Sequence, residues 1–204
     1  MIRLGLTGSI GMGKSETAKM FRRLGVPVCD ADRLVHDLYA PGGAAVRAVA
    51  QAFPGVMRGG AIDRDELGRR VVGRPGEIKR LEAIVHPLVR RAQLNFLAAA
   101  QRRRVKLVVL DIPLLFETGG EARVDYVAVA SAPAALQRAR VLRRPGMTEA
   151  RFLGILGHQV PDREKRRRAD FVIRTGLDRR AALEQVRAIV RRLRRPAGNG
   201  RRHA

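Results

Sequence analysis

Short apolar runs alternate along the chain with longer stretches in which apolar residues recur at helical spacing. The clearest run is residues 105–110, in which Lys106 is the only polar residue. Runs of this kind are typical of buried strands. Four further runs have the same character, at residues 3–7, 26–30, 124–130 and 171–173. Strands that alternate with helices predict an α/β fold, here a five-stranded parallel sheet flanked by helices.

The interval at residues 34–104 is too long for a simple crossover between strands, and we expect a helical insertion there. A helix-like stretch at residues 44–53 is followed by a turn at Pro54-Gly55. Asp63 is a candidate helix N-cap, and Glu66 occupies the capping-box position three residues later. Further helices are expected up to the end of the interval.

A second long interval, residues 134–168, contains two basic helical pieces broken at Pro145-Gly146 and Pro161. We expect it to form a helical, mobile flap, and it is called the lid segment below. The core of a single domain at residues 1–195 would then consist of residues 1–33, 105–133 and 169–195. The Gly/Arg-rich tail at residues 196–204 has the composition of a disordered segment.

Residues 8–15, which follow the first predicted strand, fit the pattern G-x-x-x-x-G-K-[ST] in full. They are called the phosphate loop below. Glycines at Gly8, Gly11 and Gly13 let the backbone curl so that its N–H groups point inward at phosphate oxygens. A strand before the loop and a helix after it are the context that such a loop requires. The loop therefore predicts phosphoryl transfer.

Two side chains of the phosphate loop have chemical roles of their own. Lys14 would bring positive charge to the β- and γ-phosphates, and the hydroxyl of Ser15 would bind Mg²⁺. The helix expected at residues 15–24 would direct its positive end at the same anion.

Two aspartates follow the second predicted strand, at the sheet edge where parallel strands present their ligand crevice. A carboxylate there can accept the proton of an attacking hydroxyl or hold Mg²⁺. Alternatively, both aspartates cap the helix expected to begin at Arg33. We expect Asp30 to be structural and Asp32 to be catalytic. Asp111, after residues 105–110, is in a Walker-B-like position and either acts on Mg²⁺ through water or is a polar strand-end residue.

Arginines of the lid segment are candidates for contacts with phosphate. Arginines that close over a triphosphate neutralise charge in the transition state and exclude water. Most of them are expected to form a solvated helix face, with one or two reaching phosphate. The candidates are Arg138, Arg140, Arg143 and Arg144.

Composition narrows the class of protein. The chain has 204 residues, of which 46% are hydrophobic and 4% aromatic, so one sizeable domain with an aliphatic core is expected. The single cysteine, Cys29, excludes an intramolecular disulfide. No apolar run approaches the ~20 residues that span a bilayer. We therefore expect a cytoplasmic monomer with no membrane partner.

The formal net charge of +22 raises the hypothesis of nucleic-acid binding. Basic residues occur throughout the chain, however, and excess positive charge suits a polyanionic small molecule equally well. We expect no specific nucleic-acid partner. The sequence also contains no Asn-Lys-x-Asp run, which a GTPase would use to read its base. A kinase of a small molecule is favoured, and a nucleoside or a nucleotide is one possible acceptor. The alternative from a different class of protein is a basic nucleic-acid-binding protein.

Several motifs together resemble the dephospho-coenzyme A kinase family, which consists of P-loop kinases. The resemblance runs in order over nearly the whole chain up to about Leu193. It rests on the phosphate loop, Asp30-Ala31-Asp32, His86-Pro87, Pro113-Leu114-Leu115-Phe116-Glu117, Gln159, Glu164-Lys165-Arg166 and Ala169-Asp170-Phe171-Val172-Ile173.

The resemblance implies that ATP phosphorylates the ribose 3′-hydroxyl of dephospho-CoA, the last step of coenzyme A synthesis. Asp32 would be the base, and Lys14 and Arg140 would stabilise the transferring phosphate. The insertion would bind the CoA portion of the acceptor, and Mg²⁺ would accompany ATP. ATP binding would involve Gly8, Gly11, Met12, Gly13, Lys14, Ser15, Glu16 and Arg144. The acceptor would contact Thr7, Asp32, His86, Pro113, Leu114, Leu115 and Glu117.

The chain departs from the family pattern at a few positions. Ser9, Met12 and Glu16 replace the usual Gly, Ser and Thr. Ser9 and Met12 should be tolerated, because backbone N–H groups bind the phosphates. Glu16 places an acid near the triphosphate, which the positive end of the helix offsets. Ile155 stands where the family often has arginine, so a phosphate contact at that position is lost. The turn expected near adenine reads Arg174-Thr175-Gly176. Glu117 is expected either to contact the acceptor or to pair with an arginine.

Overall fold

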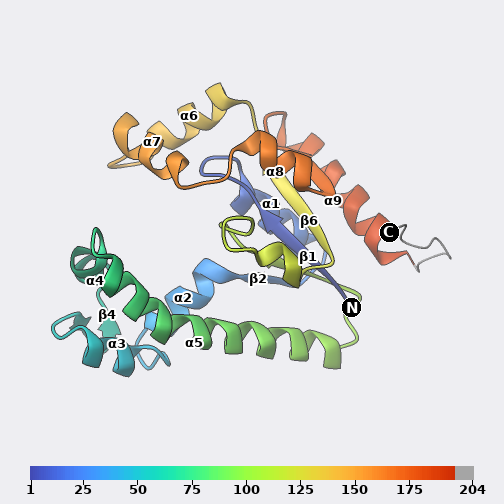
Figure 1. Cartoon of the computed structure of the whole chain (residues 1–204). Helices are drawn as coiled ribbons and strands as arrows, with labels where there is room; N and C mark the ends of the chain where they lie inside the picture. The colour runs from blue at the N-terminus through green and yellow to red at the C-terminus, as the bar shows by residue number, and fades with distance from the viewer. Residues whose placement is uncertain (196–204) are drawn as a thin grey trace. The chain divides into compact units, whose positions relative to one another are not determined.

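The computed structural model describes residues 1–195 in two compact units (Figure 1). The first unit consists of Met1–Cys29 together with the described residues from Ala100 onward, and the second is Asp30–Ala99. The second unit begins at residue 30 instead of the expected 34 and ends at 99 instead of 104. Asp32 therefore belongs to the second unit. The tail expected to be disordered, residues 196–204, lies outside the described residues.

The elements that build or flank the large sheet alternate as the sequence predicts. In chain order they are β1 (Ile2–Thr7), α1 (Lys14–Arg23), β2 (Val28–Asp30), β5 (Leu107–Asp111), the 3₁₀ turn η1 (Gly120–Arg123), β6 (Tyr126–Ser131), α6 (Ala134–Leu142), α7 (Glu149–Gly157), α8 (Asp162–Arg168), β7 (Phe171–Arg174) and α9 (Arg179–Arg194). All five predicted strands are present, with ends that differ from the prediction by about one or two residues, the usual uncertainty of an element boundary.

The sheet has the strand order β2-β5-β1-β6-β7, so β1 is the central strand. Its pairings with β5 and β6 are parallel, and Leu6 lies opposite Asp111 on one side and Ala128 on the other. Parallel strands end at the same edge of a sheet, so the phosphate loop leaves β1 beside the end of β5. This topology places Asp111 next to the loop.

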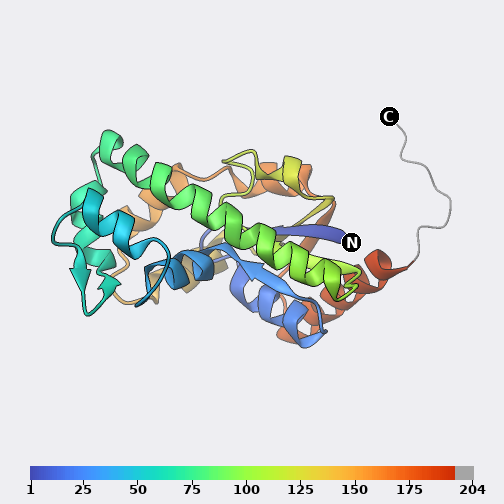
Figure 2. The same ribbon diagram turned by 90° about the horizontal axis from the view of Figure 1, so that it is seen from below.

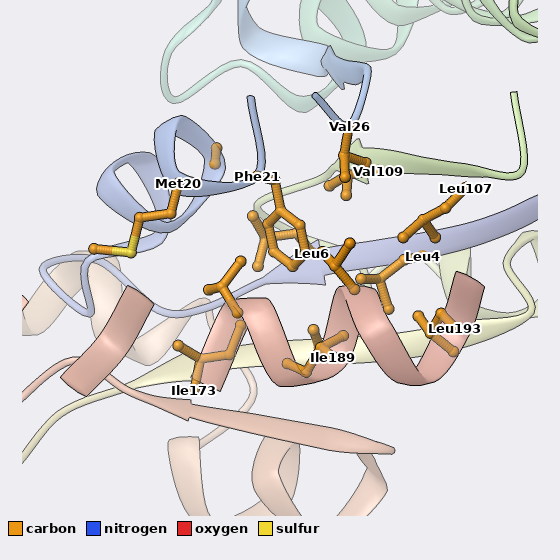
Figure 3. Packing of buried hydrophobic residues seen from close by; sticks show 14 of the residues in the cluster. Leu4, Leu6, Met20, Phe21, Val26, Leu107, Val109, Ile173, Ile189 and Leu193 are labelled. Carbon is orange, nitrogen blue, oxygen red and sulfur yellow. The ribbon is translucent and has the colours of Figure 1, made fainter. Parts of the chain in front are cut away.

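Both faces of the sheet are covered. Successive side chains of a strand point to opposite faces, so two neighbouring residues in different hydrophobic clusters report on the two faces. Ala128 belongs to the hydrophobic cluster that includes Phe21 of α1 and Ile189 of α9 (Figure 3). Its neighbour Val129 packs in another cluster with Leu115. Full burial of a valine, leucine, isoleucine or phenylalanine side chain stabilises the fold by roughly 1.5–3 kcal/mol. The core is mainly aliphatic, as expected.

The lid segment forms three helices, α6, α7 and α8, where two helical pieces were expected. Both predicted breaks occur. Gly146 has φ +69, and Pro161 is the N-cap residue of α8. Two breaks divide the segment into three helices. The first of these lies against the phosphate loop at Gly11, and the last packs on β6.

The second unit has a hydrophobic cluster of its own, centred on fully buried residues such as Val49 and Val56. Its elements are α2 (Ala31–Tyr39), α3 (Val46–Ala52), β3 (Met57–Arg58), β4 (Ala61–Ile62), α4 (Arg64–Val71) and most of α5 (Pro75–Arg102). The prediction of a purely helical insertion is wrong in one respect, because β3 and β4 form an antiparallel hairpin. Gly59 and Gly60 both have positive φ, as a tight hairpin turn requires.

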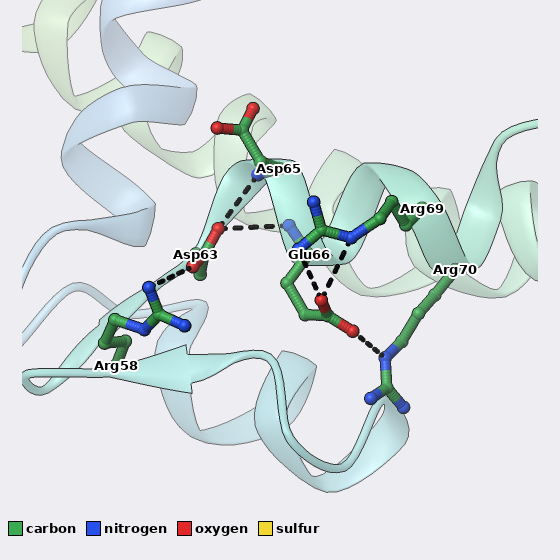
Figure 4. A network of polar contacts seen from close by, with 6 residues as sticks. All are labelled: Arg58, Asp63, Asp65, Glu66, Arg69 and Arg70. Atoms are coloured by element: carbon green, nitrogen blue, oxygen red, sulfur yellow. Dashed lines mark hydrogen bonds and ion pairs between the residues drawn. The ribbon is translucent and has the colours of Figure 1, made fainter.

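The predicted N-cap at Asp63 is confirmed. Its carboxylate accepts hydrogen bonds from the backbone N–H groups of Asp65 and Glu66, at 3.1 and 3.0 Å (Figure 4). The reciprocal half of a capping box is missing among the described contacts, because the backbone N–H of Asp63 already donates to Val56. The carboxylate of Glu66 pairs instead with arginines one turn later, at 2.6 Å from Arg69 and 3.0 Å from Arg70.

The longest helix, α5, runs without a break through Pro87 (Figure 2).

None of the helices in residues 1–195 has the length and apolar character needed to cross a bilayer.

Candidate active site

The phosphate loop adopts the curled backbone that its glycines predict. Gly11 and Gly13 have φ of +76 and +85, and the N–H of Met12 donates to the carbonyl of Ser9 at 3.1 Å. Gly13 is the N-cap residue of α1, and no side chain among the described residues caps that helix. The first N–H groups of α1 therefore form an anion-binding end.

Each of the three glycines of the loop also lies against a different neighbour. A Cβ at Gly8 would lie 2.7 Å from the carbonyl oxygen of Ala130 in β6. At Gly11 the nearest atom would be Cγ2 of Val141 in α6, at 2.5 Å, and at Gly13 it would be the hydroxyl of Thr175, at 2.9 Å. Contacts this short require the structure to shift, so the three glycines are needed for packing as well as for curvature.

Lys14 and Asp111 form an ion pair of 2.7 Å between Nζ and Oδ1. Their side chains are 14% and 2% exposed, so the pair is largely shielded from water. The sequence suggested that Asp111 either acts on Mg²⁺ through water or is a polar strand-end residue, and neither interpretation includes a contact with Lys14. Asp111 holds the phosphate-loop lysine at the end of β5.

Two glutamines of the lid segment bond the same residue of the phosphate loop. Ile10 donates its N–H to Oε1 of Gln159 at 3.0 Å, and its carbonyl accepts a bond from Nε2 of Gln137 at 2.8 Å. Gln137 lies on α6, whereas Gln159 follows α7. The loop and the lid segment are thus joined at Ile10.

Arg140 reaches the phosphate loop through Thr175, a residue of the turn expected near adenine to which the sequence assigned no contact. Its guanidinium donates to the carbonyl and the hydroxyl of Thr175, at 2.8 and 3.2 Å. The Thr175 hydroxyl donates in turn to the carbonyl of Met12 at 2.7 Å. A signal was present, because Thr175 directly follows β7 at the carboxyl edge of the sheet.

The other three candidate arginines of the lid segment, Arg138, Arg143 and Arg144, are exposed. Arg144 is exposed and lies two residues beyond the end of α6. Arg138 pairs with Glu149 across the surface of the lid segment.

Glu16, the unusual acid after the phosphate loop, is half exposed and pairs with Lys19 and Arg179 at 2.6 and 3.1 Å. The bond from Lys19 is the main reason that the pKa of this carboxyl lies below its usual value, with smaller effects from nearby arginines. The negative charge of Glu16 is therefore offset by its neighbours as well as by the helix end. Ser15 precedes it on the exposed side of α1.

Residues 113–117, called the acceptor segment because of the family resemblance, begin beside the phosphate loop. The hydroxyl of Thr7 donates to the carbonyl of Pro113 at 2.9 Å, and Thr7 itself is fully buried. Leu114 is 42% exposed, whereas Leu115 is fully buried. The side chain of Leu114 is thus open to a ligand, and that of Leu115 belongs to the core.

Glu117 ends the acceptor segment in a buried ion pair. Its Oε1 lies 2.8 Å from Nζ of Lys165 and accepts the N–H of Val160 at 2.8 Å. The expectation of an arginine partner is wrong, because α8 presents a lysine here. Burial acts to raise the pKa of the Glu117 carboxyl, but the bonds from Lys165 and from backbone N–H groups outweigh it and the pKa is lowered.

A cavity of about 460 Å³ opens beside Met12, at the carboxyl ends of β6 and β7. Its polar side is formed by Ser131, Asp162 and Arg166. The carboxylate of Asp162 accepts the Ser131 hydroxyl at 2.9 Å and pairs with Arg166 at 2.9 Å. Sites for small ligands commonly have volumes of about 300–1,000 Å³.

Asp32 and His86 belong to the second unit of the chain, whereas the site residues described so far belong to the first. The helix that follows β2 begins at Ala31 and not at the expected Arg33, with Asp30 as its N-cap accepting the N–H of Arg33 at 3.1 Å. Asp30 is therefore structural, as predicted. Asp32 is exposed in the first turn of α2, and His86 is exposed on α5 and neither caps a helix nor packs in a core among the described residues.

Comparisons with known proteins identify the family. The model of the dephospho-CoA kinase family matches residues 2–178. The chain is 66% identical over 163 residues to the dephospho-CoA kinase of Paramagnetospirillum magneticum, covering 80% of this chain and 77% of that protein. It is 56% identical over 199 residues to that of Mesorhizobium japonicum, covering 98% of this chain and 100% of that protein.

Solved structures agree on the fold. The structure of TT1252 from Thermus thermophilus is similar with a TM-score of 0.81 and 36% identity, over 94% of this chain and 97% of that one. Dephospho-CoA kinase from Campylobacter jejuni gives a TM-score of 0.64 at 22% identity, over 94% and 96% of the two chains. The resemblance drawn from the motifs is confirmed, and the chain belongs to the dephospho-CoA kinase family.

Proposed function

We propose that this chain transfers the γ-phosphoryl group of ATP to the ribose 3′-hydroxyl of dephospho-CoA, giving coenzyme A and ADP. The observation that carries the proposal is the phosphate loop, whose curled backbone and uncapped helix end stand beside Lys14 in a chain of this family. Such an arrangement binds the phosphates of a nucleotide without further side chains.

ATP would lie with its phosphates on residues 8–15 and its base in the cavity beside Met12. The backbone N–H groups of Gly11 and of residues 13–16 would face the phosphates, and Lys14 would exchange its bond to Asp111 for one to phosphate. Arg140, held by Thr175 against the loop, adds a second fixed positive charge, and Arg144 adds a third when the lid segment closes. Fixed charges of this kind stabilise a transferring phosphoryl group because they need not reorganise during the reaction.

The residues near Lys14 fit Mg²⁺, which prefers oxygen ligands and usually keeps several waters. Ser15 provides a hydroxyl on the exposed side of α1, and Asp111 provides a carboxylate at the end of β5. Residues 1–195 contain no cluster of three or more acidic, histidine or cysteine side chains that would form a cage. One or two protein ligands with phosphate oxygens are typical for this ion. Bound Mg²⁺ would offset negative charge on the β- and γ-phosphates.

The acceptor hydroxyl would meet Asp32, which closely follows the second strand of the sheet. Asp32 orients the hydroxyl and accepts its proton while the oxygen forms a bond to the γ-phosphorus. The bond from that phosphorus to the leaving oxygen of ADP breaks in the same displacement. Thr7, His86 and the acceptor segment, from Pro113 through Leu114 and Leu115 to Glu117, position the acceptor.

Substitution of Asp32 tests the assignment of the base. Asp32→Asn keeps the size and the hydrogen-bonding capacity of the side chain but removes its basicity. We expect phosphoryl transfer to fall by roughly 10²–10⁴-fold, the usual range for loss of a general base, while ATP binds with unchanged affinity in a calorimetric titration. Near-normal turnover by this variant would show that another group accepts the proton. A monomeric state, a cytoplasmic location and the lack of a specific nucleic-acid partner stay predictions.

A further inference from the structure

Lys165 is the only lysine or arginine within residues 1–195 whose side chain is fully buried. It lies in a helix of seven residues that also contains four arginines, all of them exposed to a greater degree. Its ammonium group lies 2.8 Å from Glu117, whose side chain is 12% exposed. A charge is seldom buried unless a partner compensates it, so the environment of Lys165 calls for an explanation.

Glu117 joins two segments that are far apart in sequence. The same carboxylate oxygen that faces Lys165 accepts the N–H of Val160, at the residue before the N-cap of α8. A third contact lies nearby, where the guanidinium of Arg168 stacks at 4.4 Å over the ring of Phe116. The end of the acceptor segment is therefore fastened to both ends of α8.

The beginning of the acceptor segment is fastened to the end of β1, directly before the phosphate loop. Thr7 binds the carbonyl of Pro113, and the N–H of Ile112 donates to Leu6 at 2.9 Å. Between these two attachments, Leu114 is the residue that is exposed. The orientation of its side chain thus depends on where the two ends of the segment are held.

A buried ion pair is a poor source of stability, because desolvation of the two charges offsets most of their attraction. Apolar side chains of the same volume would hold α8 on the sheet equally well or better. The contact with Lys165 and the bond from Val160 do, however, hold the Glu117 carboxylate at one place beside α8. The pair is therefore better explained by position than by stability.

We propose that Lys165 and Glu117 are positioning residues, which hold the acceptor segment against α8 so that Leu114 is presented to the bound acceptor. The proposal rests on the function proposed above and deepens it by naming what orients the acceptor side. It makes binding of the acceptor, but not of ATP, depend on the pair.

The decisive variant is the double substitution Glu117→Gln with Lys165→Met. The introduced glutamine still accepts the N–H of Val160 and the introduced methionine fills the space of lysine, so the fold should keep its thermal stability. We expect the KM for dephospho-CoA to rise about tenfold or more, as misplacement of a positioning group does, and the KM for ATP to stay unchanged. A wild-type KM for dephospho-CoA, or an equal rise in both KM values, would overturn the proposal.

Three additions keep the experiment decisive. Glu117→Gln alone is the milder variant, and an unchanged KM for dephospho-CoA in it would also overturn the proposal. Glu149→Gln, which breaks the exposed pair with Arg138 in the lid segment, is the matched control and should change neither KM. Hydrogen exchange of peptides covering residues 112–120 needs no substrate, so it separates this proposal from the function. Exchange should accelerate in the double variant, and unchanged exchange would contradict the positioning role.

Discussion

Replacing Gly11 by alanine would place a Cβ where α6 already packs. The new atom would lie 2.5 Å from Cγ2 of Val141 and 3.0 Å from the carbonyl oxygen of Gln137. Val141 is fully buried, so its side chain has no open space to move into. The backbone at Gly11 also has φ +76, a conformation that residues with a side chain rarely adopt.

Gly25 provides the matched control for this substitution. Its φ is +68, and no heavy atom of the described chain would lie within 4 Å of an added Cβ. Alanine at Gly25 therefore carries only the backbone cost, about 1–2 kcal/mol. Alanine at Gly11 adds overpacking of a buried site, about 1–3 kcal/mol. At this chain length the additional loss corresponds to a Tm lower by roughly 2–12 °C.

The assay is urea and thermal unfolding of both variants, of Val141→Ala and of the double variant Gly11→Ala with Val141→Ala. Val141→Ala removes the methyl group that alanine at Gly11 would strike. The double variant should lose less free energy of unfolding than the sum of the single variants, by at least about 1 kcal/mol. Additivity within about 0.5 kcal/mol, or equal losses for Gly11→Ala and Gly25→Ala, would refute the packing of the phosphate loop against α6.

Three further predictions concern side chains. Ser15→Ala should raise the Mg²⁺ concentration for half-maximal activity roughly tenfold. Ser15→Thr keeps the hydroxyl, so this concentration should stay unchanged. Identical Mg²⁺ curves for the two variants would show that Ser15 does not bind the metal. The lowered pKa of Glu117 means that its contribution to stability is full above its unfolded pKa of about 4.3 and is lost as the pH falls through the folded value. Urea unfolding should therefore show wild type and Glu117→Gln converging below about pH 4, and a constant difference down to about pH 3 would contradict the direction of this pKa shift. Thr175→Val removes the hydroxyl that links Arg140 to Met12 and should lower kcat with little change in the KM for dephospho-CoA, in steady-state kinetics; an unchanged kcat would show that the link is dispensable.

The elements of the sheet could be predicted because each strand is a short apolar run between helical stretches. The phosphate loop was equally clear, since its glycines and Gly-Lys-Ser occur at fixed spacing. The hairpin of β3 and β4 was missed because each strand has only two residues, too few for a pattern. Gly59-Gly60 was the one local signal of a tight turn there.

Contacts between distant positions could not be predicted from local pattern. Lys165 stands in a basic run that has the composition of a solvated helix face, and its partner Glu117 is far away in the sequence. The link from Arg140 to Met12 passes through Thr175, which has neither charge nor a motif of its own. Topology decides these contacts, because the carboxyl ends of β1, β5, β6 and β7 meet at one edge.

His86 shows the opposite case. It belongs to a motif that the sequence shows, and it is exposed in the middle of α5. Pro87 usually marks a helix boundary, but here α5 continues through it. Because the side chain of His86 is exposed, a contact with the acceptor can be tested by measuring acceptor binding to a His86 variant.

Acceptor specificity is the most direct test of the central claim. Release of ADP should be followed in a coupled assay with ATP and Mg²⁺, using dephospho-CoA, adenosine and nucleoside monophosphates as separate acceptors. We expect robust ADP release with dephospho-CoA, a product phosphorylated at the ribose 3′-hydroxyl, and little release with the other acceptors. Turnover of a nucleoside or nucleoside monophosphate with none on dephospho-CoA would contradict it.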